Sequence, residues 1–205
     1  AKIIDGKSIA AEVKADVAKK VSELKKSGVT PCLAVILVGN NPASVSYVSG
    51  KRKALAEAGM EDRSIELPES TTEQEILSLI QKLNEDKTVH GILVQLPLPS
   101  HIDEKKVTNS ISPEKDVDGL HPENLGKLVQ ADPTGFIPCT ALGIATLLDA
   151  YEIPVRGKHV VIVGRSITVG KPLALLLAQK GKDATITLAH TATENLAKLC
   201  ASADI

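Results

Sequence analysis

Aromatic side chains are scarce in this chain of 205 residues, which has one Phe, two Tyr and no Trp. The core is therefore expected to be aliphatic, and stacking on nucleic-acid bases has few candidate residues. The 24 basic and 25 acidic residues give a net charge of −1, with both signs interspersed. Such a balance creates no broad attraction to nucleic acid or to an anionic membrane, so we expect neither as a partner.

Cysteine and long apolar runs are also in short supply. Cys32, Cys139 and Cys200 are widely spaced and form no CxxC pair, so the sequence predicts neither a zinc site nor a disulfide framework. No apolar run approaches the roughly 20 residues of a membrane helix, and residues 1–15 show no signal-peptide pattern. We therefore expect a cytoplasmic protein.

The first half of the chain alternates apolar runs with helical patterns. Cys32–Val38 (CLAVILV) and His90–Leu96 (HGILVQL) are typical of strands buried on both faces of a parallel sheet, and Arg63–Leu67 predicts a shorter strand. The predicted helices are one that follows Ser8 as N-cap and closes near Gly28, Ala43–Gly59, and one opened by the capping box Thr72-Glu73-Gln74-Glu75. The βαβαβ order predicts a parallel sheet with right-handed crossovers.

The second half begins with Ser112–Thr140, which is rich in Pro, Gly, Asp and Asn and lacks periodicity. Such long irregular stretches tend to be functional or to join domains. The elements predicted beyond it are a helix over 141–150, strand His159–Val163, helix Lys171–Lys180, strand Ala184–Ala189, helix Asn195–Cys200 and the opening of a strand at Ala203-Asp204-Ile205. The order predicts a second βαβ unit, and so an α/β protein of two domains, 1–140 and 141–205.

Tyr47 and Lys51 are four residues apart in the predicted helix, so their side chains should share one face. A lysine in a partly enclosed site can act as an acid, a base or an electrostatic catalyst, and the phenol could orient it or stack on a flat substrate. The plainer interpretation is amphipathic surface packing. Gln95 lies near the carboxyl end of a predicted strand, where open α/β sheets bind ligands. It is either a satisfied structural amide or a partner of Lys51 or of a substrate.

Gly164–Gly170 joins a predicted strand to a predicted helix, the place of a nucleotide-binding turn. The spacing departs from GxGxxG because Ser166 replaces the second glycine, and a purely structural turn is the alternative. Arg165 favours the nucleotide interpretation. A guanidinium beside such a turn suits the extra phosphate of NADP better than the free ribose of NAD.

Asp116 and Asp118 fall in Lys115-Asp116-Val117-Asp118-Gly119, inside the irregular segment. Three interpretations stay open: turn or cap residues, metal ligands, or a carboxylate that grips a planar array of N–H donors. Two carboxylates without nearby His or Glu make a poor metal site, so no metal is expected. Cys139, in Pro138-Cys139-Thr140, is expected to mark a hinge, because no base for a cysteine nucleophile is identifiable.

Taken in order along the chain, seven sequence stretches resemble those of the bifunctional methylenetetrahydrofolate dehydrogenase/methenyltetrahydrofolate cyclohydrolase family. The matching stretches are Asp5-Gly6-Lys7, Val38–Ser44, Tyr47-Val48 with Lys51, Gly91–Pro99, Pro113–Gly119, Pro138-Cys139-Thr140, and Val163–Ser166 with Val169-Gly170 and Pro172. The resemblance implies an N-terminal α/β domain that binds folate, and a Rossmann-type NADP domain that is incomplete in this chain. It also implies oxidation of 5,10-methylenetetrahydrofolate with NADP, hydrolysis of the methenyl product to 10-formyltetrahydrofolate, and a homodimer.

The same resemblance assigns roles to individual residues. Lys51 corresponds to the catalytic lysine, Tyr47 to the tyrosine that orders it and contacts the pterin, and Gln95 to the amide bonded to that lysine. Asp118 corresponds to the carboxylate that anchors the pterin. The implied substrate-binding set is Tyr47, Lys51, Val94, Gln95, Leu96 and Asp118, and the implied cofactor-binding set is Gly164, Arg165, Ser166, Thr191 and Thr140.

Three departures from the family pattern are visible. The family's Cys-His-Ser is Ala189-His190-Thr191 here, so Thr191 keeps a hydroxyl, and Pro-Cys-Thr-Pro becomes Pro-Cys-Thr-Ala at Ala141. The family continues past the position of Ile205 with further strands, a Pro-Gly-Gly-Val-Gly-Pro turn and a C-terminal helix, so we expect this sequence to be part of a longer chain. Two competing hypotheses are a dehydrogenase of shikimate-dehydrogenase type and a non-catalytic binder of folate or nucleotide.

Overall fold

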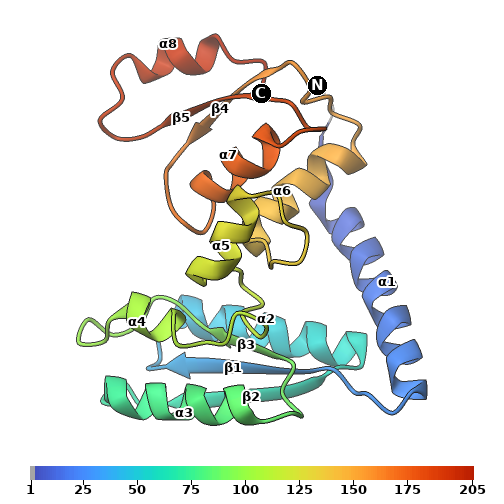
Figure 1. The fold of residues 1–205 in the computed structure, drawn as a ribbon, viewed down its shortest axis with the longest axis vertical. Helices are drawn as coiled ribbons and strands as arrows, with labels where there is room; N and C mark the ends of the chain where they lie inside the picture. The colour runs from blue at the N-terminus through green and yellow to red at the C-terminus, as the bar shows by residue number, and fades with distance from the viewer. Residues whose placement is uncertain (1–2) are drawn as a thin grey trace. The chain divides into compact units, whose positions relative to one another are not determined.

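The protein is described by a computed structural model over residues 3–205 (Figure 1). Residues 1 and 2, where the predicted first domain begins, lie outside the described residues. The chain divides into two compact units. One unit is Lys7–Val117, and among the described residues the other combines residues 3–6 with Asp118–Ile205. Each unit is α/β with a parallel sheet, as the sequence predicts.

The first unit has a sheet of three parallel strands in the order β2-β1-β3. The strands are β1 (Cys32–Val38), β2 (Glu61–Leu67) and β3 (Gly91–Val94). Their alternating side chains face opposite helices. Cys32, Ala34 and Ile36 share one buried cluster with Ile76 and Ile80, whereas Val35 and Leu37 share another with Val48. The sheet is therefore covered on both faces, which explains why β1 is a continuous apolar run.

The helices of this unit are α1 (Gly6–Lys26), α2 (Pro42–Ala58), α3 (Glu73–Glu85) and the short α4 (Glu104–Thr108). Asn41 caps α2 by accepting from the N–H groups of Ala43 and Ser44, and the capping box of Thr72 and Glu75 is present. Ser8 is not an N-cap, because the helix already begins at Gly6. The chain is fastened just before it, where the Asp5 N–H donates to the Tyr151 hydroxyl at 2.6 Å.

Strand β3 is shorter than the predicted His90–Leu96, since the ladder stops at Val94. The Gln95 N–H still donates to the Ile36 carbonyl at 2.8 Å, but Pro97 has no N–H to continue the pairing. Gln95 is thus the first residue after the strand, at the carboxyl end of the sheet.

The second unit contains two parallel strands, β4 (His159–Val163) and β5 (Thr185–Ala189), joined through α7 (Gly170–Ala178). This is the predicted βαβ unit. Its other helices are α5 (Pro122–Val129), α6 (Cys139–Ala150) and α8 (Leu196–Ala201). The core is a single aliphatic cluster in which Ala145 and Leu148 of α6 and Leu176 and Leu177 of α7 pack with β4.

Two predictions for this half are corrected. The segment Ser112–Thr140 is not wholly irregular, because α5 forms inside it, with His121 as N-cap and Pro122 in its first turn. Helix α6 begins at Cys139, so Cys139 and Thr140 belong to its first turn, and a hinge at this helix start stays a prediction. Residues 203–205 form no strand, although the Val161 N–H donates to the Ile205 carbonyl at 2.9 Å.

Candidate functional site

Lys51 and Gln95 meet at the carboxyl end of the first unit's sheet. The Lys51 Nζ donates to Gln95 Oε1 at 2.9 Å, and Gln95 Nε2 donates to the Leu96 carbonyl at 2.8 Å. The second bond fixes the amide with its oxygen toward the ammonium group. The sequence left open whether Gln95 is a structural amide or a partner of Lys51, and the contact with Lys51 is present. Lys51 is half-buried on α2. Because Gln95 accepts from one of its three N–H donors, two remain for other acceptors.

Tyr47 lies one helical turn before Lys51, and the Lys51 Nζ is 5.7 Å from the centre of its ring. A cation over an aromatic face at an exposed position contributes roughly 0.5–1 kcal/mol. The Tyr47 side chain is 66% exposed, and its hydroxyl has no hydrogen bond to any other residue between 3 and 205. The ring therefore presents a free face and a free hydroxyl beside the ammonium group.

Ser44 lies two turns before Lys51 on the same face of α2, and it is 3% exposed. Within the described part of the chain its hydroxyl has no hydrogen-bond partner. A buried polar group without a partner needs an explanation, such as a water or a ligand atom. Sequence reasoning gave Ser44 no role, although its spacing from Lys51 was a usable signal.

Residues on both sides of Gln95 differ in exposure. Val94 is buried in the sheet, whereas Leu96 is half-buried. A cavity of about 260 Å³ lies at the same end of the sheet, and it is lined by Val38, Gly39, Asn40, Asn41, Glu69, Pro97, Leu98 and Pro99. Lys51 and Gln95 are not among its lining residues, so this hollow is separate from their contact.

Asp116 and Asp118 occupy different environments. Asp116 is 2% exposed and forms an isolated parallel bridge with Ile92 of β3. Asp118 is half-buried and follows Val117, the last residue of the first unit. Gly91 is required beside this segment, because a Cβ there would lie 2.5 Å from Val117 Cγ1. The pterin-binding role of Asp118 remains a prediction.

The predicted nucleotide turn joins β4 to α7. Gly164 has φ +127°, a backbone conformation that side chains rarely allow. A Cβ on Gly170 would lie 2.0 Å from the Gly164 carbonyl oxygen, so only glycine permits this close return of the chain. The Ser166 hydroxyl accepts from the Val169 N–H at 3.1 Å and holds the turn together. Between residues 3 and 205, the N–H groups of Arg165 and Ser166 have no hydrogen-bond acceptor.

A cavity of about 590 Å³ opens at this turn. It is lined by Val163, Gly164, Arg165, His190, Thr191, Thr193 and Leu196. These residues come from the carboxyl ends of β4 and β5, where α/β sheets bind ligands. Gly164, Arg165 and Thr191, three residues of the implied cofactor-binding set, therefore line one cavity. Ser166 and Thr140 are not lining residues, and both are exposed.

The charge of this cavity suits an anion. The Arg165 side chain is exposed and makes no ion pair or hydrogen bond with the described residues, and the lining contains no carboxylate. His190 and Thr193 were not selected from the sequence. His190 Nδ1 accepts from the Ala192 N–H at 3.2 Å, which orients the ring, and the backbone N–H of His190 donates to the Thr193 hydroxyl at 2.8 Å.

Two features are absent from residues 3–205. No group of three or more His, Cys, Asp or Glu side chains is arranged to hold a metal ion. No helix in that range is both long enough and apolar enough to span a bilayer. The three cysteines are free thiols.

Comparison with known proteins covers nearly the whole chain. Residues 4–118 match the family model of the tetrahydrofolate dehydrogenase/cyclohydrolase catalytic domain, and residues 138–205 match that of its NAD(P)-binding domain. The bifunctional protein FolD of Ligilactobacillus salivarius is 54% identical over 205 residues, a match that spans 100% of this chain and 71% of that protein.

Solved structures agree with these matches. Bifunctional enzyme FolD, a methylenetetrahydrofolate dehydrogenase/cyclohydrolase from Campylobacter jejuni, superposes with a TM-score of 0.94 at 46% identity, covering 97% of this chain and 70% of that one. The Trypanosoma brucei methylenetetrahydrofolate dehydrogenase-cyclohydrolase, complexed with NADP cofactor and inhibitor, gives 0.94 at 37% identity, covering 100% and 70%.

Proposed function

Because the chain belongs to the tetrahydrofolate dehydrogenase/cyclohydrolase family, we propose that it oxidises 5,10-methylenetetrahydrofolate to 5,10-methenyltetrahydrofolate with NADP and hydrolyses that product to 10-formyltetrahydrofolate. The observation that carries this proposal is the 2.9 Å bond between Lys51 Nζ and Gln95 Oε1. It holds a proton-carrying group at the end of the sheet where ligands bind.

The two reactions make different demands on the chain. Oxidation needs the substrate's methylene carbon held against the nicotinamide, which is chiefly a matter of positioning. NADP supplies the hydride acceptor when it is bound. Tyr47 is proposed to stack on the pterin, and Asp118 to bind its N–H groups. Val94 and Leu96 are proposed to line the substrate site beside Gln95.

Hydrolysis also requires protons to move. Water that adds to the bridging carbon loses a proton, and the nitrogen that leaves this carbon must gain one. The Lys51 ammonium is proposed to serve this exchange at Nζ. Gln95 occupies one of its three donors and holds its direction. The unpartnered hydroxyl of Ser44, on the same helix face, is a further candidate contact for a water in this site.

The second cavity fits NADP by its chemistry. The glycine turn lets the backbone approach a pyrophosphate, and the Arg165 and Ser166 N–H groups have no acceptor within residues 3–205. An enzyme specific for NAD commonly carries a carboxylate at the end of the second strand for the ribose hydroxyls. Here His190 and Thr191 follow β5 instead, and Arg165 lines the same cavity, which favours a 2′-phosphate. Thr140 stays a proposed cofactor contact.

We expect Arg165→Ala to raise the KM for NADP by roughly tenfold or more, because it removes one charge-assisted phosphate contact. The KM for NAD should change little. Steady-state dehydrogenase assays with both cofactors measure this. Arg156→Ala is the matched control, since Arg156 is an exposed arginine of the same unit that pairs with Asp183 and does not line the cavity. Equal use of NAD and NADP by the unaltered protein would contradict the assignment of Arg165.

A coupled assay tests the whole proposal. Methenyl-folate absorbance should rise when methylenetetrahydrofolate and NADP are added, and should then decay as formyl-folate forms. A dehydrogenase of shikimate-dehydrogenase type would give no such signal, and a non-catalytic binder would bind folate or NADP without turnover. Failure to form methenyl-folate at saturating substrate and NADP would overturn the proposed oxidation.

Three further expectations stay part of the proposal. Residues 1–140 are proposed to form the folate-binding domain and residues 141–205 the NADP-binding domain, with the proposed cofactor contact Thr140 at their boundary. The family resemblance supports a homodimer, which sedimentation equilibrium would test. The three free thiols suit a reducing compartment, so the cytoplasm is proposed as the location.

A further inference from the structure

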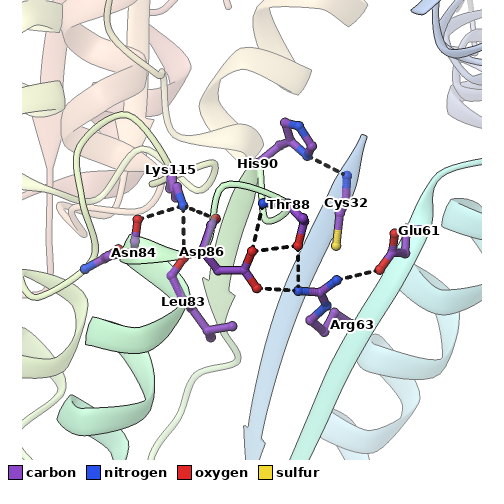
Figure 2. Close-up of polar contacts among 9 residues, drawn as sticks. All are labelled: Cys32, Glu61, Arg63, Leu83, Asn84, Asp86, Thr88, His90 and Lys115. Carbon is purple, nitrogen blue, oxygen red and sulfur yellow. Dashed lines mark hydrogen bonds and ion pairs between the residues drawn. The ribbon is translucent and has the colours of Figure 1, made fainter. Parts of the chain in front are cut away.

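Lys115 is bonded to the carboxyl end of a helix. Its ammonium group donates to the carbonyl oxygens of Leu83 at 2.9 Å, Asn84 at 2.8 Å and Asp86 at 2.8 Å (Figure 2). All three ammonium donors are thereby used. The Leu83 and Asn84 carbonyls belong to the last turn of α3, which leaves them without a partner inside the helix, and the C-cap Asp86 carbonyl also accepts from the Val89 N–H at 3.1 Å. The negative end of the helix dipole adds to the attraction. Lys115 is therefore fixed in place, with no donor left for a substrate.

The carbonyls that receive Lys115 are themselves held. The Asp86 carboxylate accepts from the Thr88 hydroxyl at 2.6 Å and N–H at 2.8 Å, and from Arg63 at 2.7 Å (Figure 2). Thr88, with Arg63 nearby, keeps the pKa of the Asp86 carboxyl below its ordinary value. Because Arg63 is on β2, its bond to Asp86 ties this end of α3 to that strand, and a second bond to Glu61 at 2.7 Å holds the guanidinium in place. The carbonyls that accept from Lys115 thus lie at a helix end that is joined to β2 by an ion pair.

The segment that follows Lys115 is joined to the start of β3. The Ile92 N–H donates to the Lys115 carbonyl at 2.7 Å, and the next residue, Asp116, bridges Ile92 in parallel. Val117 then packs where Gly91 has no side chain. The Val117 N–H donates back to the Lys115 carbonyl at 2.9 Å, so the backbone turns at Asp116. Asp118 directly follows this turn.

We propose that Lys115 is a positioning residue for Asp118. By pinning the start of this segment to α3, it fixes the path of the backbone that delivers the Asp118 carboxylate. The inference rests on the proposed pterin-binding role of Asp118. It gives a role to Lys115, in a motif in which only Asp118 had one.

The test compares Lys115→Met with Lys82→Met. Both remove one ammonium group at the carboxyl end of α3, but Lys82 makes no side-chain hydrogen bond or ion pair with the described residues. Lys115→Met should raise the KM for methylenetetrahydrofolate roughly tenfold while kcat changes less than about twofold, because misplacing an anchor weakens binding without touching the reacting groups. Lys115→Gln keeps an amide donor and should give an intermediate KM, which serves if Lys115→Met proves too unstable to assay. Lys82→Met should leave both constants unchanged.

A double-mutant cycle separates positioning from a merely structural role. If Lys115 acts through Asp118, Lys115→Met should add little to the folate KM of Asp118→Ala. Additive effects of the two substitutions, or a lowered melting temperature with an unchanged folate KM, would overturn the proposal. An unchanged KM in Asp118→Ala alone would instead refute the pterin role of Asp118. The two failures are therefore distinguishable.

Discussion

Lys51→Met is expected to abolish hydrolysis of methenyl-folate while leaving measurable dehydrogenase activity, so that methenyl-folate accumulates. Methionine keeps the length of the side chain but removes the ammonium group and its bond to Gln95. Proton transfer by a positioned side chain contributes roughly 10²- to 10⁴-fold to a rate, so hydrolysis should fall by at least about 100-fold. Hydride transfer depends mainly on positioning and should lose less.

The control for this substitution is Lys53→Met. Lys53 lies on the same helix, but its side chain is 80% exposed and its nearest carboxylate, on Glu57, is 4.0 Å away. Lys53→Met should keep both the dehydrogenase activity and the hydrolysis of methenyl-folate. Gln95→Leu should share part of the Lys51→Met defect, because it removes the acceptor that holds the ammonium group. Normal hydrolysis of methenyl-folate by Lys51→Met would show that Lys51 is not the proton-transfer group.

The strands and helices that the sequence predicts best are those with strong local signals. The bounds of β1 and β4 agree residue for residue with the predicted Cys32–Val38 and His159–Val163. Both are continuous apolar runs, and the apolar character of β1 follows from burial on both faces. The Thr72 capping box likewise marks the start of α3. Local signals of this kind need no knowledge of distant parts of the chain.

The errors arise where short elements or distant contacts decide the outcome. Helix α5 has only eight residues within a segment full of turn formers, and composition conceals it. Ser8 is a good capping residue, yet a bond from Asp5 to Tyr151, 146 residues away, precedes a helix that begins at Gly6. Tertiary contacts here override a local preference.

The same division applies to the candidate sites. The pairing of Lys51 with Gln95 joins residues 44 positions apart, and it was one of two alternatives until the geometry was known. The sequence did not identify His190 or Ser44 as site residues. Their environments, a cavity wall and a buried helix face, cannot be inferred from neighbouring residues. The sequence did not predict the contacts of Lys115 either, because its acceptors are backbone carbonyls, which every residue has.

The second large effect is expected at Asp118, which should bind the pterin and take no part in chemistry. A carboxylate that faces two pterin N–H groups loses both hydrogen bonds in Asp118→Ala. At about 1.5 kcal/mol for each bond to a charged group, folate binding should weaken by about 3 kcal/mol, or on the order of 100-fold. The loss should appear in equilibrium binding of folate, whereas the affinity for NADP should be retained.

Asp118→Asn should fail nearly as badly as Asp118→Ala, although it preserves size and shape. Its amide places an NH₂ donor where the pterin also presents a donor, so one bond becomes a repulsion. Glu114→Gln makes the same chemical change on an exposed side chain four residues earlier, and it should leave folate affinity unchanged. Isothermal titration of folate into the three variants and the unaltered protein measures the differences. If both Asp118 variants bind folate normally, Asp118 is only a turn residue, because a carboxylate that grips two N–H groups cannot be exchanged for an amide or a methyl group without loss of affinity.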